Sequence, residues 1–234
     1  MQTAATLLLI VCYGLGGYLA WAQRTPIYLF ALVAGHVGSL ASPLWRMLYG
    51  VSYNLELTPV QTLLGQLVPL PVILGSGWYY TLPALIVFFF YTTRWWFPGA
   101  LTCILTYCIF LLYHLLSETV GLRTQTWAYS GTHLPFDFSA PLLGAMMAGL
   151  TSYGLLYVIL AMHRFAWLSM LLSLLPAALA ISLLVHGLLG APLWLALLLD
   201  GQTWSSVAGM VTTFVLLAWS VQIITGGITR IESH

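Results

Sequence analysis

The chain contains no lysine and very little charge of either sign. Its 234 residues include six basic residues, all of them arginine, and only 5% of the residues are charged. The missing lysine excludes a retinal Schiff base and the lysine of a phosphate-binding loop. Six scattered arginines do not form a nucleic-acid-binding patch. A soluble surface carries roughly a quarter or more charged residues, so a soluble globular protein is excluded as well.

Cysteine is also scarce. The three cysteines, Cys12, Cys103 and Cys108, all lie inside apolar runs, which excludes a disulfide framework between loops. We expect them to pack as small apolar residues. The sequence has neither a Cys-x-x-Cys pair nor a His-Glu-x-x-His motif, and no metal site is predicted.

The chain is rich in apolar residues. Hydrophobic residues make up 61% of it, and its mean hydropathy is +0.96. A membrane-spanning helix needs about 20 apolar residues, so the length predicts an all-α, polytopic membrane helix bundle of about seven helices, forming one domain over residues 1–234. The expected spans are 3–22, 26–45, 71–93, 97–120, 140–162, 166–190 and 205–227. The first of these is expected to be a retained span rather than a cleaved leader.

Two further apolar stretches, 59–68 and 191–199, are too short to cross a bilayer in the usual way. Each is predicted to be an interfacial or re-entrant segment, and a spanning role for either would change the topology.

Seven spans sort the charges between the two sides of the membrane. One side carries four arginines: Arg24, Arg94, Arg164 and Arg230. The other side carries Arg46 and Arg123 together with four of the five acids, which are Glu56, Glu118, Asp137 and Asp200. The positive-inside rule then predicts a multi-pass protein of the cell membrane with a cytoplasmic C-terminus, and an acidic opposite face.

Ionisable side chains inside spans are candidates for function because they are costly in a bilayer. They are His36, His114, Glu118 and His186. His114 and Glu118 are one helical turn apart and share a face, where a buried carboxylic acid is suited to general acid catalysis. A purely structural interpretation makes Glu118 a helix-end residue at the interface and His114 a core histidine.

The connection after Glu118 combines aromatic and titratable residues, including Trp127, Tyr129 and Asp137. The π-faces of its aromatic rings are suited to stabilising a carbocation. Anchoring at the membrane interface is the alternative explanation for these aromatics.

Two short runs carry a resemblance. Glu118-Thr-Val-Gly121 is followed by Trp127-Ala-Tyr129, and Leu199-Asp200-Gly201 closes a short apolar segment before the last span. In these runs the chain resembles the lycopene-cyclase-domain proteins and the fungal-type membrane terpene cyclases. The resemblance implies protonation of an alkene or epoxide, with Glu118 as proton donor, His114 as its tuning partner and Asp200 as second acid or terminating base.

The resemblance covers roughly a quarter of the chain and has two departures. The acidic pair that follows Pro-Leu in the lycopene-cyclase-domain proteins is missing. Where the terpene cyclases carry an acid late in the second helix, this chain has Pro43-Leu44-Trp45-Arg46.

The leading hypothesis is a pocket on the acidic face for an apolar lipid or isoprenoid, in an enzyme without a cofactor. Its catalytic residues would be Glu118, His114 and Asp200. Its substrate-binding residues would be Trp127, Tyr129, His36, His186 and Asp137. The alternative is a non-catalytic membrane subunit of a respiratory or photosynthetic complex that holds haem, quinone or pigment, and a transporter is the third hypothesis. The expected partners are membrane lipid, an apolar small molecule, and either further copies of the chain or other membrane subunits, with no nucleic acid.

Overall fold

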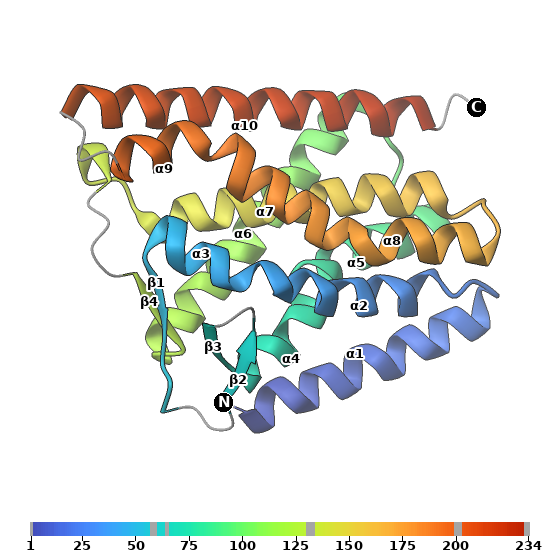
Figure 1. The fold of residues 1–234 in the computed structure, drawn as a ribbon. Helices are drawn as coiled ribbons and strands as arrows, with labels where there is room; N and C mark the ends of the chain where they lie inside the picture. The colour runs from blue at the N-terminus through green and yellow to red at the C-terminus, as the bar shows by residue number, and fades with distance from the viewer. Residues whose placement is uncertain (1, 57–59, 64–65, 130–133, 199–202, 232–234) are drawn as a thin grey trace.

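The structure, a computed structural model, describes residues 2–56, 60–63, 66–129, 134–198 and 203–231. These residues form a bundle of helices with two short antiparallel β-ladders (Figure 1). Within the described ranges, six helical stretches are long and apolar enough to cross a membrane: 3–22, 70–92, 100–123, 140–162, 167–189 and 204–231. The prediction of an all-α polytopic membrane protein is confirmed.

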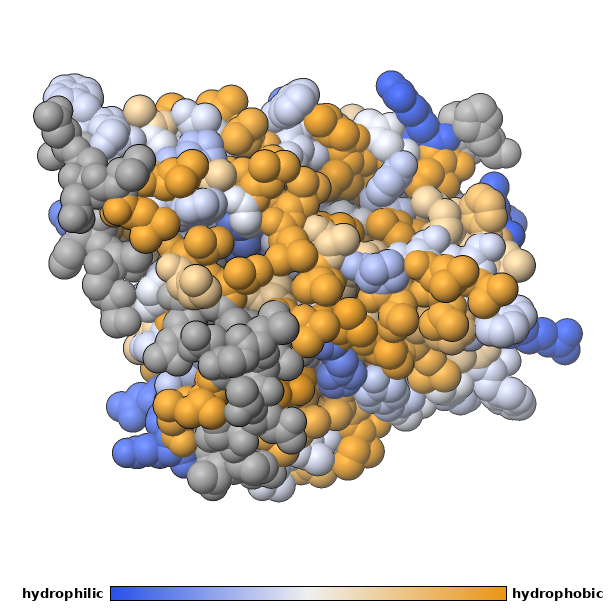
Figure 2. Space-filling model, viewed as in Figure 1, coloured by the Kyte–Doolittle hydropathy of each residue, from blue (hydrophilic) through white to orange (hydrophobic). Residues whose placement is uncertain are grey.

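The first expected span is α1 (Gln2–Ala22), a single straight helix at the edge of the bundle. It packs against α2 (Ile27–Gly38) and α4 (Leu70–Tyr79). Most of its apolar side chains face outward, among them Leu7, Val11 and Trp21. Figure 2 shows many apolar side chains across the central part of the viewed face, as expected of a surface in contact with lipid.

The second expected span is a broken helix. α2 ends at Gly38 and is followed by the 3-10 turn η1 (Ser39–Ala41) and by α3 (Ser42–Tyr49), which continues in nearly the same direction (Figure 1). Pro43 explains the break, because it has no N–H to donate to the carbonyl one turn earlier. The span predicted over 26–45 is thus formed by two helices that are joined by a 3-10 turn.

The third expected span is divided as well. α4 is followed at Thr81 by α5 (Thr81–Thr92), and Tyr80 lies at the junction. Pro83 lies in the first turn of α5, where a missing N–H is tolerated, and leaves a carbonyl of α4 without its helical partner. The break turns the last residues of α4 towards α6 (Ala100–Arg123).

The core of the bundle is α7 (Ala140–Met162), whose side chains are mostly buried. It packs against α6, α5, α8 (Trp167–Ser182) and α10 (Thr203–Ile231). Gly149 lets α6 approach closely, because a Cβ there would lie 3.2 Å from the backbone nitrogen of Leu111. Small residues at such crossings are typical of helix packing in membranes.

The sixth span changes its winding near its end. α8 passes at Leu183 into a π-helical turn, η3 (Leu183–Leu189), which contains His186. After Gly190 comes the short helix α9 (Ala191–Leu198), which packs beside α10. The stretch 191–198 is thus a short helix that continues the sixth span past a bend.

The stretch 59–68 also has a defined form in its described part. β2 (Val60–Leu63) pairs with β3 (Gln66–Pro69) as an antiparallel ladder, with Val60 opposite Pro69. An apolar segment of this length satisfies its backbone polar groups by pairing with itself.

A second ladder joins two distant connections. β1 (Val51–Tyr53) follows α3 directly, and β4 (Trp127–Tyr129) follows α6. Val51 lies opposite Tyr129 and Tyr53 opposite Trp127. Gly50 makes the turn from α3 into β1 with a φ of 63°, a conformation that glycine adopts without strain.

The two ends of the bundle differ as the charge pattern predicts. The connections α1–α2, α5–α6 and α7–α8 and the C-terminus of α10 lie at one end (Figure 1), and they carry the four arginines Arg24, Arg94, Arg164 and Arg230. The other end holds the β1–β4 ladder and the 3-10 turn η2 (Pro135–Asp137).

Candidate functional site

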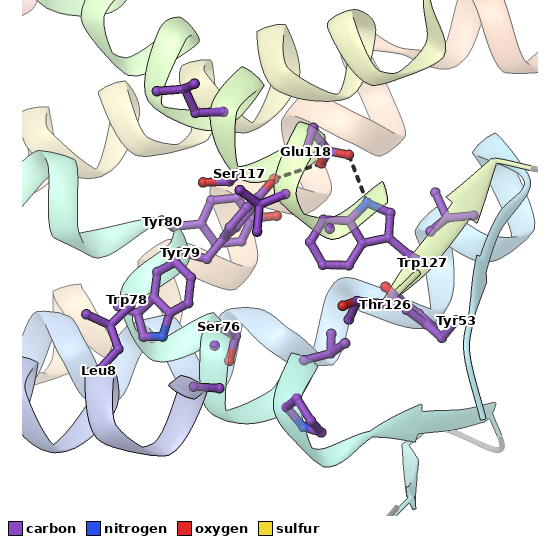
Figure 3. Close-up of a pocket in the computed structure, with 18 of the residues that line it drawn as sticks. Leu8, Tyr53, Ser76, Trp78, Tyr79, Tyr80, Ser117, Glu118, Thr126 and Trp127 are labelled. Atoms are coloured by element: carbon purple, nitrogen blue, oxygen red, sulfur yellow. Dashed lines mark hydrogen bonds between the residues drawn. The ribbon is translucent and has the colours of Figure 1, made fainter. Parts of the chain in front are cut away.

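A cavity of about 520 Å³ lies at the end of the bundle that holds the β1–β4 ladder. Its walls come from α1, α3, α4, α6, β1 and β4 and are predominantly apolar and aromatic (Figure 3). Leu8, Leu116 and Val120 line it and are also exposed on the outer surface, so the cavity borders the part of the bundle that faces lipid. The aromatic lining residues are Trp45, Tyr53, Trp78, Tyr79, Tyr80, Tyr113, Trp127 and Tyr129.

Glu118 is the acid in the wall of this cavity, and only 6% of it is exposed. Its Oε1 accepts a hydrogen bond of 3.0 Å from the Tyr79 hydroxyl. Its Oε2 accepts one of 3.0 Å from Trp127 Nε1 and one of 2.8 Å from the Tyr129 hydroxyl. Figure 3 shows Glu118 between Tyr79 and Trp127. All three donors are neutral, so the carboxyl group is held by dipoles rather than by an ion pair.

The end of α6 brings two of the three donors to Glu118. Gly121 lies one turn after Glu118, and the indole ring of Trp127 lies so close to it that a Cβ would overlap the ring. The amide of Thr126 donates to the carbonyl of Gly121 at 2.9 Å and closes the helix end. The chain then enters β4, where pairing with β1 fixes the direction of Trp127 and Tyr129.

The environment of Tyr129 favours its neutral form. Burial raises the pKa of the Tyr129 hydroxyl above its usual value, and the nearby Glu118 carboxylate and the hydrogen bond to it raise the pKa further. The hydroxyl therefore keeps its proton and remains a donor to Glu118 well into the alkaline range.

His114 lies on the same face of α6 as Glu118, as predicted, and it is completely buried. Its Nε2 is 2.7 Å from Ser152 Oγ on α7. Its ring meets the ring of Tyr79 edge-on, with centroids 4.6 Å apart. His114 thus supports a residue that binds Glu118, and it is not itself among the residues lining the cavity.

A smaller cavity of about 40 Å³ lies next to the first. Glu118, Tyr79, Tyr80, Tyr129 and Trp45 line both cavities. The smaller cavity is also lined by His186 from η3 and by residues of α7, including Gly144 and Met147. Glu118 therefore lies in the wall of two neighbouring cavities.

The other predicted site residues have different surroundings. The Nδ1 atom of His36 lies 3.2 Å from the carbonyl oxygen of Ile73, and its ring stacks on the ring of Tyr13 with the centroids 6.0 Å apart. Asp137 is exposed on η2. Neither residue is among those that line the two cavities. Asp200 lies outside the described residues.

The sequence analysis missed several aromatic residues of the site, namely Trp45, Tyr53, Trp78, Tyr79, Tyr80 and Tyr113. The run Trp78-Tyr79-Tyr80 ends α4, and three consecutive aromatics at the end of an apolar helix resemble an ordinary interfacial belt. The break after α4 turns them inward, and no local pattern marks that break as part of a site.

Among the described residues, no group of three or more histidine, cysteine or acidic residues is placed to hold a metal ion. The larger cavity combines a buried carboxyl group with apolar and aromatic walls.

Comparison with known proteins gives no match: no family model, no curated protein and no solved structure is similar to this chain.

Proposed function

We propose that the larger cavity binds an apolar lipid or isoprenoid and that Glu118 acts on it as a general acid. One observation carries this proposal: a buried carboxyl group with three neutral hydrogen-bond donors stands in the wall of an apolar cavity. The cavity volume of about 520 Å³ falls in the range of roughly 300–1,000 Å³ that is typical of small-molecule sites.

The proposed reaction begins with transfer of the Glu118 proton to one carbon of an alkene. The π electron pair forms the new C–H bond, the O–H bond breaks, and a carbocation and a carboxylate result. The negative charge then falls on the group to which Tyr79, Trp127 and Tyr129 donate. Donors that are already in place stabilise such developing charge without reorganisation.

The carbocation itself would be stabilised by the aromatic walls. Trp78, Tyr53 and Tyr80 line the same cavity and present π-systems, which attract cations. Loss of a proton from a neighbouring carbon to Glu118 would restore the acid and leave an isomerised or cyclised product. These reaction steps require no oxidant and no cofactor.

The experiment has two steps. First, the protein is solubilised in a mild detergent, and the compounds bound to it are extracted and identified by mass spectrometry. Second, turnover of the recovered isoprenoid is measured with Glu118→Gln and with Glu56→Gln, which replaces an exposed acid in the connection that follows β1.

We expect Glu118→Gln to keep the bound compound and to lose turnover, because the amide keeps the shape of the side chain but has no acidic proton to give. Glu56→Gln should retain full turnover. Full activity in Glu118→Gln would remove Glu118 from the mechanism.

The cofactor-subunit hypothesis is a second candidate, and one observation favours it. His114 Nδ1 is buried and has no hydrogen-bond partner among the described residues, and an imidazole nitrogen of this kind is suited to ligate a metal centre. An absorption spectrum from 300 to 900 nm tests it: a haem or pigment band that disappears in His114→Ala would favour this candidate over the enzyme.

For the orientation in the membrane, we propose that the end of the bundle with four arginines is cytoplasmic.

A further inference from the structure

The smaller cavity is shaped to hold very little. Its volume of about 40 Å³ is close to the share of liquid volume of one water molecule, which is about 30 Å³. A porphyrin or an isoprenoid chain does not fit into this space. Trp45, Tyr80, Glu118 and His186 give it polar atoms on several sides.

Two of these residues have buried polar atoms without a protein partner. Trp45 Nε1 and the hydroxyl of Tyr80 are inaccessible to solvent and meet hydrogen-bond geometry with none of the described residues, although the Tyr80 hydroxyl also interacts with the side chain of Ser182. Only 1% of Tyr80 is exposed. A buried donor left without a partner costs about 1–3 kcal/mol, so two of them beside one small cavity indicate a polar occupant.

The other two residues offer acceptors. His186 Nδ1 lies 3.0 Å from the carbonyl oxygen of Ser182. Because a carbonyl only accepts, Nδ1 carries the hydrogen, and the neutral ring keeps Nε2 as an acceptor. Glu118 Oε1 accepts one hydrogen bond, from Tyr79, whereas Oε2 accepts two. One acceptor position on Oε1 therefore remains.

We infer that the smaller cavity binds a single ordered water molecule. The water accepts hydrogen bonds from Trp45 Nε1 and the Tyr80 hydroxyl, and it donates to His186. When Glu118 is ionised, the water also donates to the free position on Oε1, which the acid proton occupies when the carboxyl group is neutral. Four partners match the hydrogen-bonding capacity of water, and a buried water with two to four polar partners is a stable part of a protein structure.

The position of this water gives it a role, which rests on the proposed function. The water occupies the smaller cavity, whereas the proposed substrate occupies the larger one, so a bound substrate does not take the place of the water. It exchanges the proton of the Glu118 carboxyl group with bulk protons between turnovers. In deuterium oxide the exchange converts the acid O–H into O–D, and the product then carries deuterium at the protonated carbon.

The water itself is tested by a crystal structure of the full chain at about 2 Å or better. We expect density within hydrogen-bond distance of Trp45 Nε1 and Tyr80 Oη in the wild type. The density should be lost or displaced in Tyr80→Phe and in Trp45→Phe. Trp78→Phe is the matched control, because Trp78 Nε1 is also buried without a partner but lines only the larger cavity.

A smaller cavity without density in the wild type, or one filled by a side chain that bonds Trp45 and Tyr80, would overturn the inference.

The role of the water in proton exchange is tested separately by measuring deuterium incorporation into the product during turnover in deuterium oxide. It should fall severalfold in Tyr80→Phe and stay unchanged in Tyr18→Phe, which removes an exposed hydroxyl of α1, and equal incorporation in both would remove the role. An ordered water in a protein that turns over no isoprenoid would leave the water site established and the proposed function wrong.

Discussion

The hydroxyl of Tyr129 donates to Glu118 Oε2 at 2.8 Å across the turn that ends α6. Tyr129 is also the residue of β4 that lies opposite Val51 of β1. The hydrogen bond on the acid is thus held by a backbone ladder to a strand that follows α3. The geometry around Glu118 depends on this ladder as well as on α6.

Removing the Tyr129 hydroxyl tests how much one hydrogen-bond donor to Glu118 contributes to turnover. We expect Tyr129→Phe to lower turnover about tenfold to a hundredfold, because a hydrogen bond to a charged group contributes about 1.5–3 kcal/mol. The control is Tyr18→Phe on the exposed side of α1. Equal turnover in the two variants would show that the Tyr129 bond does not serve the reaction.

The buried Tyr129 hydroxyl should also make the stability of the folded protein depend on pH in the alkaline range. Since burial raises the pKa of Tyr129 in the folded protein, its contribution is fully present below the unfolded pKa of about 10 and is lost as the pH rises towards the folded pKa. The difference in thermal midpoint between wild type and Tyr129→Phe should therefore be constant from pH 7 to 9 and should narrow above pH 10. A difference that widens above pH 10 would contradict the assignment.

Gly121 is predicted to be intolerant of a side chain. A methyl group in Gly121→Ala would overlap the indole of Trp127, so the ring has to move and its bond to Glu118 is lost. We expect a loss of about 1–3 kcal/mol in the free energy of unfolding and a severalfold loss of turnover.

The control for Gly121→Ala is Gly226→Ala in α10, where a Cβ meets nothing within 4 Å. Alanine favours a helix by up to about 1 kcal/mol over glycine, so this variant should be neutral or more stable. Thermal unfolding and turnover measured on both variants decide the question, and equal behaviour would show that Trp127 does not need the space above Gly121.

Binding of lipid in the larger cavity can be tested by introducing a large side chain on α1 that fills the cavity. Ala5 lines the cavity, and Ala5→Trp should reduce the bound lipid recovered by extraction and mass spectrometry severalfold. Val11→Trp places the same ring at an exposed position of α1 that is not among the cavity-lining residues, and it should leave recovery unchanged. Full recovery from Ala5→Trp would locate the lipid elsewhere.

The sequence predicts the helices well because lipid requires long apolar runs, and 3–22 and 140–162 are found as expected. It also predicts that His114 and Glu118 share a face, since helical spacing alone determines this. The rest depends on tertiary contacts. Tyr79 reaches Glu118 because α4 ends at a break, and Trp127 reaches it because β4 pairs with β1. His36 was predicted because an ionisable side chain is costly in a bilayer, and in the fold its Nδ1 lies near the carbonyl of Ile73 and its ring stacks on Tyr13.

The position of Glu118 near the end of α6 bears on what surrounds the acid. Arg123, the last residue of the helix, comes five positions after Glu118, which is about 8 Å along the axis. In the folded protein the acid therefore lies close to the aqueous boundary at the end that holds the β1–β4 ladder. Two of its three donors, Trp127 and Tyr129, belong to β4. Pairing of β4 with β1 thus replaces water around the acid by two protein donors.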